Sequence, residues 1–311
     1  MLDMLAGHLD SAIVAFTQIP WWDNGFFAQD QNVRGLLATL IVCFVCGSLG
    51  SQVVGNRMAF FSDALAHCAF AGVGLGLLFS LLAGTEDDEL VRQRLTIIMV
   101  CFGVGIGLMI ALVRDQTGLA SDTVIGVFFA GALGVGALCT RLVSGRRFFS
   151  IEDFIFGSPN WVSPWQIILL FGLAIATITF QMTMYNSLML ASISPTLSLS
   201  RRVPVRLSRY LFIVLLALMV NLSQQITGTL LINGLLIVPA AAAANVASNL
   251  RQLFWLSIIA AMAVGFGGYL ISWEVSCNFP RQSIGISGAI VLLSVLVFLA
   301  SIPAGRLLRR A

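Results

Sequence analysis

The sequence predicts an all-α fold, a polytopic bundle of helices that crosses a lipid bilayer about nine times, with eight crossings as the alternative. Two features predict it. Hydrophobic residues make up 58% of the 311 residues and charged residues only 10%, whereas a soluble domain carries about 25% charged residues. The mean hydropathy is +0.95, and the apolar residues form runs of about 20, the length of a membrane-crossing helix. This composition excludes a disordered chain and a simple soluble enzyme.

The apolar runs give nine expected spans with short connections. The spans cover residues 35–54, 59–83, 95–113, 120–142, 164–184, 207–222, 228–248, 252–273 and 283–302. Because the connections leave no room for a soluble domain, we expect a single transmembrane domain over 35–302. An interfacial or extracytoplasmic segment over 1–34 precedes it, and a short cytoplasmic tail over 303–311 follows.

The first segment lacks the features of a secretory signal. Residues 1–27 contain no Lys or Arg, so the positively charged start of a signal peptide is missing. Trp21 and Trp22, with Phe26 and Phe27 nearby, suit the headgroup zone of a membrane, where aromatic side chains gather. We therefore expect this segment to lie at the membrane surface.

Arginine placement sets the expected orientation, since cytoplasmic loops are enriched in basic residues. The tail carries Arg306, Arg309 and Arg310. With this tail in the cytoplasm, ten of the 17 Arg residues lie inside and seven outside. The connection 185–206 is then cytoplasmic and the N-terminus is outside.

Two features mark the sixth and seventh expected spans. The polar residues of Leu222–Thr227 predict a tight hairpin on the outer face. Pro239 lies within the seventh span, where proline removes a backbone hydrogen bond and kinks a helix. The kink is either a packing feature or the bending point of a gating motion.

Composition also limits the chemistry of the chain. All basic residues are arginine, so the Lys of a Walker-type phosphate loop is absent and the chain is not an ATPase of that kind. The net charge of +3 is spread along the chain without a polybasic run, which predicts no nucleic-acid partner. Alternate glycines in the second and third spans predict close helix contacts; they are Gly72, Gly74, Gly76, Gly103, Gly105 and Gly107.

Asp63 and His67 are the candidate metal ligands, because ionisable groups inside a span are costly and mark function. Their i, i+4 spacing places both side chains on one helix face. Carboxylate oxygen and imidazole nitrogen bind borderline divalent ions such as Zn²⁺ or Mn²⁺. The alternative is a buried Asp–His hydrogen bond that only fixes packing. Cys68 points about 100° away around the helix and is not expected to be a ligand.

Other polar residues have simpler interpretations. Asp122, or Ser121 before it, is expected to cap the helix that begins there. His8 is expected to be exposed at the interface, and Glu274 to be a solvated residue at the end of a span. In the connection 185–206, Ser194, Pro195, Arg201 and Arg202 form either a positive-inside anchor or a docking element for a cytoplasmic partner.

Four ordered segments carry a family resemblance. The segment RMAFFSDALAH at 57–67 resembles the Arg…Gly-Asp-Ala-Leu-Ser-His segment of the zinc/manganese-type ABC transporter permeases. The segment SDTVIGVFF at 121–129 is similar to the family's Asp-Thr-Ala-Ile-Gly-Ile-x-Phe, and IFGS at 155–158 to its Leu-Phe-Gly-Asn. The run from Gly228 to Ala243 resembles its Gly-x-Leu-Leu…Pro-Ala-Ala-x-Ala segment.

The resemblance implies a permease dimer in a bacterial plasma membrane, driven by two cytoplasmic ATP-binding subunits and supplied by an extracytoplasmic metal-binding protein. It implies import of Zn²⁺, Mn²⁺ or Fe²⁺ with Asp63 and His67 contacting the metal, no permanently bound cofactor, and an ATPase coupling helix within 185–206. The alternatives are a stand-alone proton-coupled metal carrier, which tends to have further buried acids or histidines, and an intramembrane hydrolase, which needs a second catalytic group facing the pair.

Overall fold

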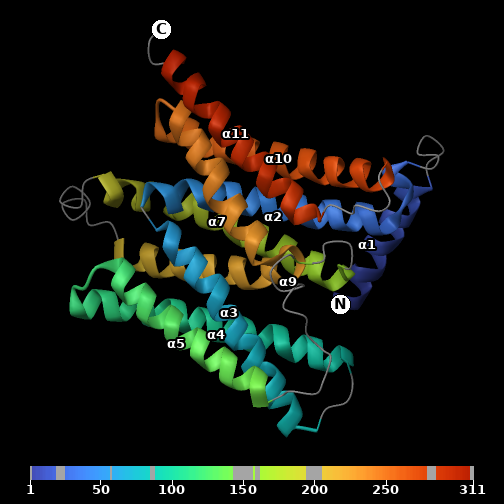
Figure 1. Ribbon diagram of the computed structural model, residues 1–311, viewed down its shortest axis with the longest axis horizontal. Helices are drawn as coiled ribbons and strands as arrows, with labels where there is room; N and C mark the ends of the chain where they lie inside the picture. The colour runs from blue at the N-terminus through green and yellow to red at the C-terminus, as the bar shows by residue number, and fades with distance from the viewer. Residues whose placement is uncertain are drawn as a thin grey trace. The chain divides into compact units, whose positions relative to one another are not determined.

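The computed structural model describes residues 2–18, 25–56, 58–84, 88–142, 157, 162–193, 205–278 and 285–308. The described residues form helices and no strands (Figure 1). The helices are α1 (Leu2–Thr17), η2 (Phe26–Ala28), α2 (Asp30–Gly55), α3 (Ala59–Leu82), α4 (Asp88–Thr117), α5 (Ser121–Leu142), α7 (Pro164–Ile193), α9 (Val205–Val246), α10 (Leu250–Asn278) and α11 (Ile286–Leu308). The expected docking residues Ser194, Pro195, Arg201 and Arg202, and also Trp21 and Trp22, lie outside the described residues.

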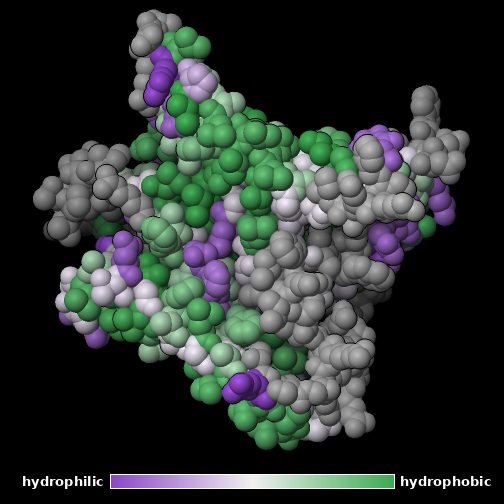
Figure 2. Space-filling view, viewed as in Figure 1, coloured by the Kyte–Doolittle hydropathy of each residue, from purple (hydrophilic) through white to green (hydrophobic). Residues whose placement is uncertain are grey.

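Eight of these helices are long and apolar enough to cross a membrane, within the part of the chain that is described. The predicted polytopic all-α fold is therefore confirmed. Large apolar side chains remain exposed along the helices, among them Ile97, Leu138, Met182 and Leu296. Figure 2 shows apolar residues over much of the visible described surface, as lipid contact requires.

The chain forms two compact units. Unit 1 contains residues 1–54, 155–178 and 225–311, and unit 2 contains residues 55–154 and 179–224. Two long helices, α7 and α9, contribute one part to each unit.

In unit 1, α2 is buried on nearly all sides from Gly35 to Val53. Glycines allow its neighbours to approach closely. A Cβ at Gly47 would lie 2.7 Å from the Cα of Ile258 in α10, and one at Gly50 would meet the carbonyl oxygen of Leu236 in α9. Beside the first contact, the Ser257 hydroxyl donates a 2.7 Å hydrogen bond to the Gly47 carbonyl. Small residues thus bring the helix backbones together, as is typical of membrane bundles.

The N-terminal segment is attached to the rest of unit 1. The Arg34 guanidinium lies 2.7 Å from the Asp10 carboxylate, which ties α1 to the beginning of α2. Phe26 is buried and packs edge-to-face on Tyr269 and Trp273 of α10. The first long apolar helix therefore begins at Asp30, five residues before the expected span.

α9 contains both the sixth and the seventh expected spans. Its 42 residues would extend about 63 Å as a straight helix, about twice the hydrocarbon thickness of a bilayer. The predicted hairpin loop at 222–227 is wrong, because these residues are helical. The break is at Gly228 (φ 75°, ψ 165°), a conformation essentially restricted to glycine. Pro239, in contrast, keeps helical dihedral angles and is buried.

Contacts from neighbouring segments of unit 1 surround this break. The Ser287 hydroxyl donates a 3.2 Å hydrogen bond to the Thr227 carbonyl. Gly157, itself at φ 70°, fits against the backbone of Thr227 and Gly228, where any Cβ would collide. The polar run before the break is therefore packed inside protein and is not a surface turn.

In unit 2, α3 packs on α4 and α5 through its three alternating glycines. A Cβ at Gly72 would lie 2.9 Å from the Cα of Met99 in α4, and one at Gly74 would lie 2.9 Å from the Cβ of Cys139 in α5. A Cβ at Gly76 would lie 2.7 Å from the Leu95 side chain. The close contacts predicted from the glycine pattern are confirmed for this helix. These contacts hold α3 on two sides along its second half.

Candidate metal centre

Asp63 and His67 lie one turn apart in the first half of α3. Their side chains are close together, with 3.5 Å between His67 Nδ1 and Asp63 Oδ1. The Asp63 side chain remains 44% exposed and the His67 side chain 37% exposed. The pair is therefore on an accessible face of unit 2.

The hydrogen bonding of His67 leaves one ring nitrogen for a ligand. Nδ1 lies 2.9 Å from the backbone carbonyl oxygen of Asp63. A carbonyl oxygen can only accept, so we assign the proton of neutral His67 to Nδ1. Nε2 then carries the lone pair that binds a metal, and the carbonyl fixes the tautomer in the way common for metal-binding histidines.

The surroundings of the pair are largely apolar. The His67 ring meets Phe129 of α5 edge-to-face, with 5.1 Å between the ring centroids and 66° between their planes. Cys68 is buried in a separate cluster with Ala71 and Ala132. Its thiol is thus on the packed side of α3, which agrees with its exclusion as a ligand.

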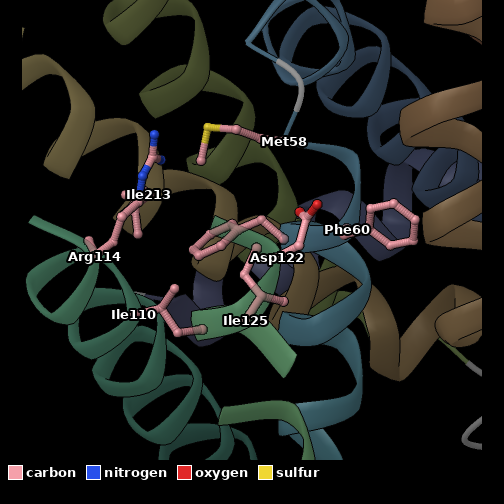
Figure 3. A pocket seen from close by; sticks show the side chains of 9 residues that line it. Met58, Phe60, Ile110, Arg114, Asp122, Ile125 and Ile213 are labelled. Carbon is pink, nitrogen blue, oxygen red and sulfur yellow. The ribbon is translucent and has the colours of Figure 1, made fainter. Parts of the chain in front are cut away.

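A hollow lies at the same end of unit 2, where α3 and α5 begin and α4 ends (Figure 3). Met58, Phe60, Arg114 and Asp122 line it together with apolar side chains. Figure 3 shows the Asp122 carboxylate lying between Phe60 and Met58. Among the described residues no ion pair joins Asp122 to Arg114.

The prediction that Asp122 caps α5 is wrong, because the N-cap lies two residues earlier. The backbone N–H groups of Thr123 and Val124 donate to the carbonyl of Ala120, so Ala120 stands at the N-cap. Asp122 is exposed in the first turn of α5, where a negative charge is favourable beside the positive end of the helix dipole.

The described part of the chain contains no cluster of three or more His, Cys, Asp or Glu side chains able to hold a metal, so the pair offers two candidate ligands. His8 and Glu274 are exposed as expected. Sequence reasoning missed the contact of Phe129 with His67. It also missed the ion pair of Asp115 with Arg209, at 3.1 Å, which joins the last turn of α4 to the first turns of α9.

Eight membrane-length helices in the described part of the chain, with an acid and an imidazole at an accessible face of one of them, define a polytopic membrane protein with a candidate ion-binding pair. Comparison with known proteins identifies the family. The chain belongs to the ABC 3 transport family, whose model matches residues 29–304. The match includes all of the candidate spans except the last three residues of the final one, and it leaves α1 outside.

Individual relatives agree with this assignment. The manganese import system permease protein ScaB of Streptococcus gordonii is 26% identical over 280 residues, with 89% of this chain and 93% of ScaB covered. The high-affinity zinc uptake system membrane protein ZnuB of Haemophilus influenzae is 25% identical over 237 residues, with 76% of this chain and 86% of ZnuB covered.

A solved structure has the same fold. The structure of PsaBC from Streptococcus pneumoniae in complex with Fab superposes with a TM-score of 0.71 at 24% identity, covering 90% of this chain and 94% of that chain.

Proposed function

We propose that this chain is the membrane-spanning permease subunit of an ATP-binding cassette importer for a divalent metal ion. The observation that carries the proposal is the half-exposed Asp63–His67 pair within a span of a chain that belongs to the ABC 3 transport family. The relatives named for manganese import and zinc uptake favour Mn²⁺ or Zn²⁺ as the cargo, with Fe²⁺ as the alternative. We expect no permanently bound cofactor.

In this proposal His67 Nε2 and an Asp63 carboxylate oxygen bind the metal after a side-chain rotation, because Asp63 Oδ1 lies beside Nδ1 in the structure. Oxygen and imidazole nitrogen together suit first-row divalent ions. Two protein ligands leave the coordination shell incomplete, so water or a second subunit must supply the rest. An incomplete shell also favours release, which a transport site requires.

A second copy of the chain is proposed to cover the pair. An acid and an imidazole at membrane depth are costly against lipid and normally face protein or a water-filled cavity. The neighbouring face of α5 is exposed at Gly126, Ala130 and Gly134, and a Cβ at either glycine would meet no atom within 4 Å. Small residues every four positions allow close helix association in membranes. Two copies facing each other there would contribute two Asp and two His ligands to one translocation path.

The energy is proposed to come from a separate cytoplasmic ATP-binding subunit, because a chain without lysine has no Walker-type phosphate loop. We propose that Ser194, Pro195, Arg201 and Arg202 belong to the element that docks on this subunit. An extracytoplasmic metal-binding protein would deliver the ion.

The proposed location is the bacterial inner membrane, with lipid around the helices and no nucleic-acid partner. The N-terminal segment 1–34 would lie outside, the domain 35–302 would span the membrane, and the tail 303–311 would lie in the cytoplasm. ATP binding and hydrolysis would switch the helices between outward-open and inward-open states. Pro239 is the proposed bending point in α9.

The test is purification of the detergent-solubilised chain from its native membrane, followed by uptake measurements in liposomes. We expect a stoichiometric ATP-binding subunit in the purified complex, and ⁵⁴Mn or ⁶⁵Zn uptake that requires ATP inside the cytoplasmic compartment of the assay. Uptake by the chain alone, driven by a proton gradient without ATP, would establish the stand-alone carrier instead.

A further inference from the structure

Two amide side chains are buried side by side in the first part of α9. Asn221 is 0% exposed and Gln224 is 2% exposed, and both belong to unit 2. Their i, i+3 spacing places the two side chains on one face of the helix. Both side chains are buried inside unit 2, so bulk water does not contact them.

Most of the hydrogen-bonding capacity of these two side chains is unused. Asn221 Nδ2 donates a 2.7 Å hydrogen bond to the Ala217 carbonyl, one turn earlier in the same helix. Among the described residues, Asn221 Oδ1, Gln224 Oε1 and Gln224 Nε2 have no hydrogen-bond partner. The pair therefore presents two acceptor oxygens and one donor nitrogen to the interior of the unit.

The mixture of unused acceptors and donors indicates which kind of molecule could bind to both side chains. A cation could satisfy the two amide oxygens but would be repelled by the Gln224 Nε2–H group. An anion could accept from Nε2 but not donate to the oxygens. Water donates twice and accepts twice, so it can bond to Oδ1, Oε1 and Nε2 together, and buried waters typically make about three such bonds.

The neighbouring helix is shaped around the Asn221 amide. A Cβ at Gly103 of α4 would lie 2.6 Å from Asn221 Cγ and 2.7 Å from Oδ1, so any other residue there would displace the amide group. Gly105, two residues further along α4, has no atom within 4 Å of a Cβ position. Gly103 thus has a specific role, because its missing side chain leaves the space that the Asn221 amide occupies.

We propose that Asn221 and Gln224 hold an ordered water in the interior of the protein, beside Gly103. The site is separate from the Asp63–His67 pair and independent of the cargo.

The test is water-edited solid-state NMR of the ¹⁵N-labelled full chain in lipid bilayers, which measures magnetisation transfer from water to individual N–H groups. The backbone amide of Leu216, fully buried in the same helix, is the dry reference. The exposed side chain of Asn249 is the wet reference. We expect water magnetisation to reach the side-chain amides of Asn221 and Gln224 at a rate close to that measured for the Asn249 side chain. Magnetisation transfer as slow as that to the Leu216 backbone amide would overturn the proposal.

A variant tests whether one water is shared. Gln224→Met preserves the approximate side-chain volume and removes both polar groups. We expect the water transfer to the Asn221 side chain to fall markedly, because the water loses two of its three bonds. Unchanged transfer to Asn221 in this variant would show that the two amides do not share a water and would refute the proposed arrangement.

Discussion

Gly72→Ala tests whether the packing of α3 against α4 is as tight as the structure indicates. The added methyl group would lie 2.9 Å from Met99 Cα and 3.4 Å from Met99 Cβ and Cγ. Carbon atoms in contact are ordinarily 3.5–4.0 Å apart. The nearest atom belongs to the backbone of α4, so no side-chain rotation relieves the contact. The two helices would have to separate by about 0.6 to 1.1 Å at this level.

The expected cost follows from this displacement. Extra methyl groups in a well-packed interior destabilise proteins by about 1–3 kcal/mol, and the backbone contact places Gly72→Ala in the upper part of that range. For a chain of this size, each kcal/mol lowers the melting temperature by roughly 2 °C. We therefore expect the melting temperature of the purified protein to fall by about 4 to 6 °C, measured at one fixed scan rate.

Gly105→Ala in α4 is the matched control, because no atom lies within 4 Å of its Cβ position. Alanine favours a helix over glycine by up to about 1 kcal/mol, so the control should melt at the same temperature or slightly higher. Equal melting temperatures for Gly72→Ala and Gly105→Ala would refute the packing argument, since the two substitutions add the same atoms.

Three further substitutions test other parts of the fold. Ser257→Ala removes the buried 2.7 Å hydrogen bond to the Gly47 carbonyl, and we expect a loss of about 0.6–1.7 kcal/mol in denaturant unfolding; no loss would mean that the bond is not formed. Arg34→Ala removes the partly exposed ion pair with Asp10, at a cost of at most about 1 kcal/mol. It should speed proteolysis within α1, and high salt should have the same effect on the unsubstituted protein. Pro239→Ala restores a backbone donor in α9 and should raise the melting temperature while slowing ATP-driven uptake; unchanged uptake would exclude a gating role.

The sequence alone predicts the class of fold because the bilayer imposes simple rules. A span must be about 20 residues long and apolar, and these rules are visible in the composition. The close contacts at Gly72 and Gly74 follow for the same reason, since helices in lipid associate through small residues. The pair of Asp63 and His67 is also predictable, because ionisable residues are so rare within the spans.

Other features depend on tertiary contacts that a linear pattern does not contain. The polar run at 222–227 has the composition of a surface turn, yet neighbouring segments bury it, and the break is placed at Gly228, which alone can adopt the required dihedral angles. The free nitrogen of His67 depends on a backbone carbonyl at 2.9 Å, which follows from side-chain rotation and not from spacing. The difference between Gly103 and Gly105 depends on which face of α4 meets Asn221.

Metal uptake by site variants tests the central claim most directly. Asp63→Asn and His67→Gln preserve approximate size and remove a ligand, and Glu274→Gln, at an exposed carboxylate, is the matched control. Each variant is reconstituted with its ATP-binding partner after its folding is checked by melting temperature. We expect at least a tenfold fall in ATP-driven ⁵⁴Mn or ⁶⁵Zn uptake for the two site variants, with the control unchanged. Full uptake by either site variant would contradict the assignment of Asp63 and His67 as the metal centre.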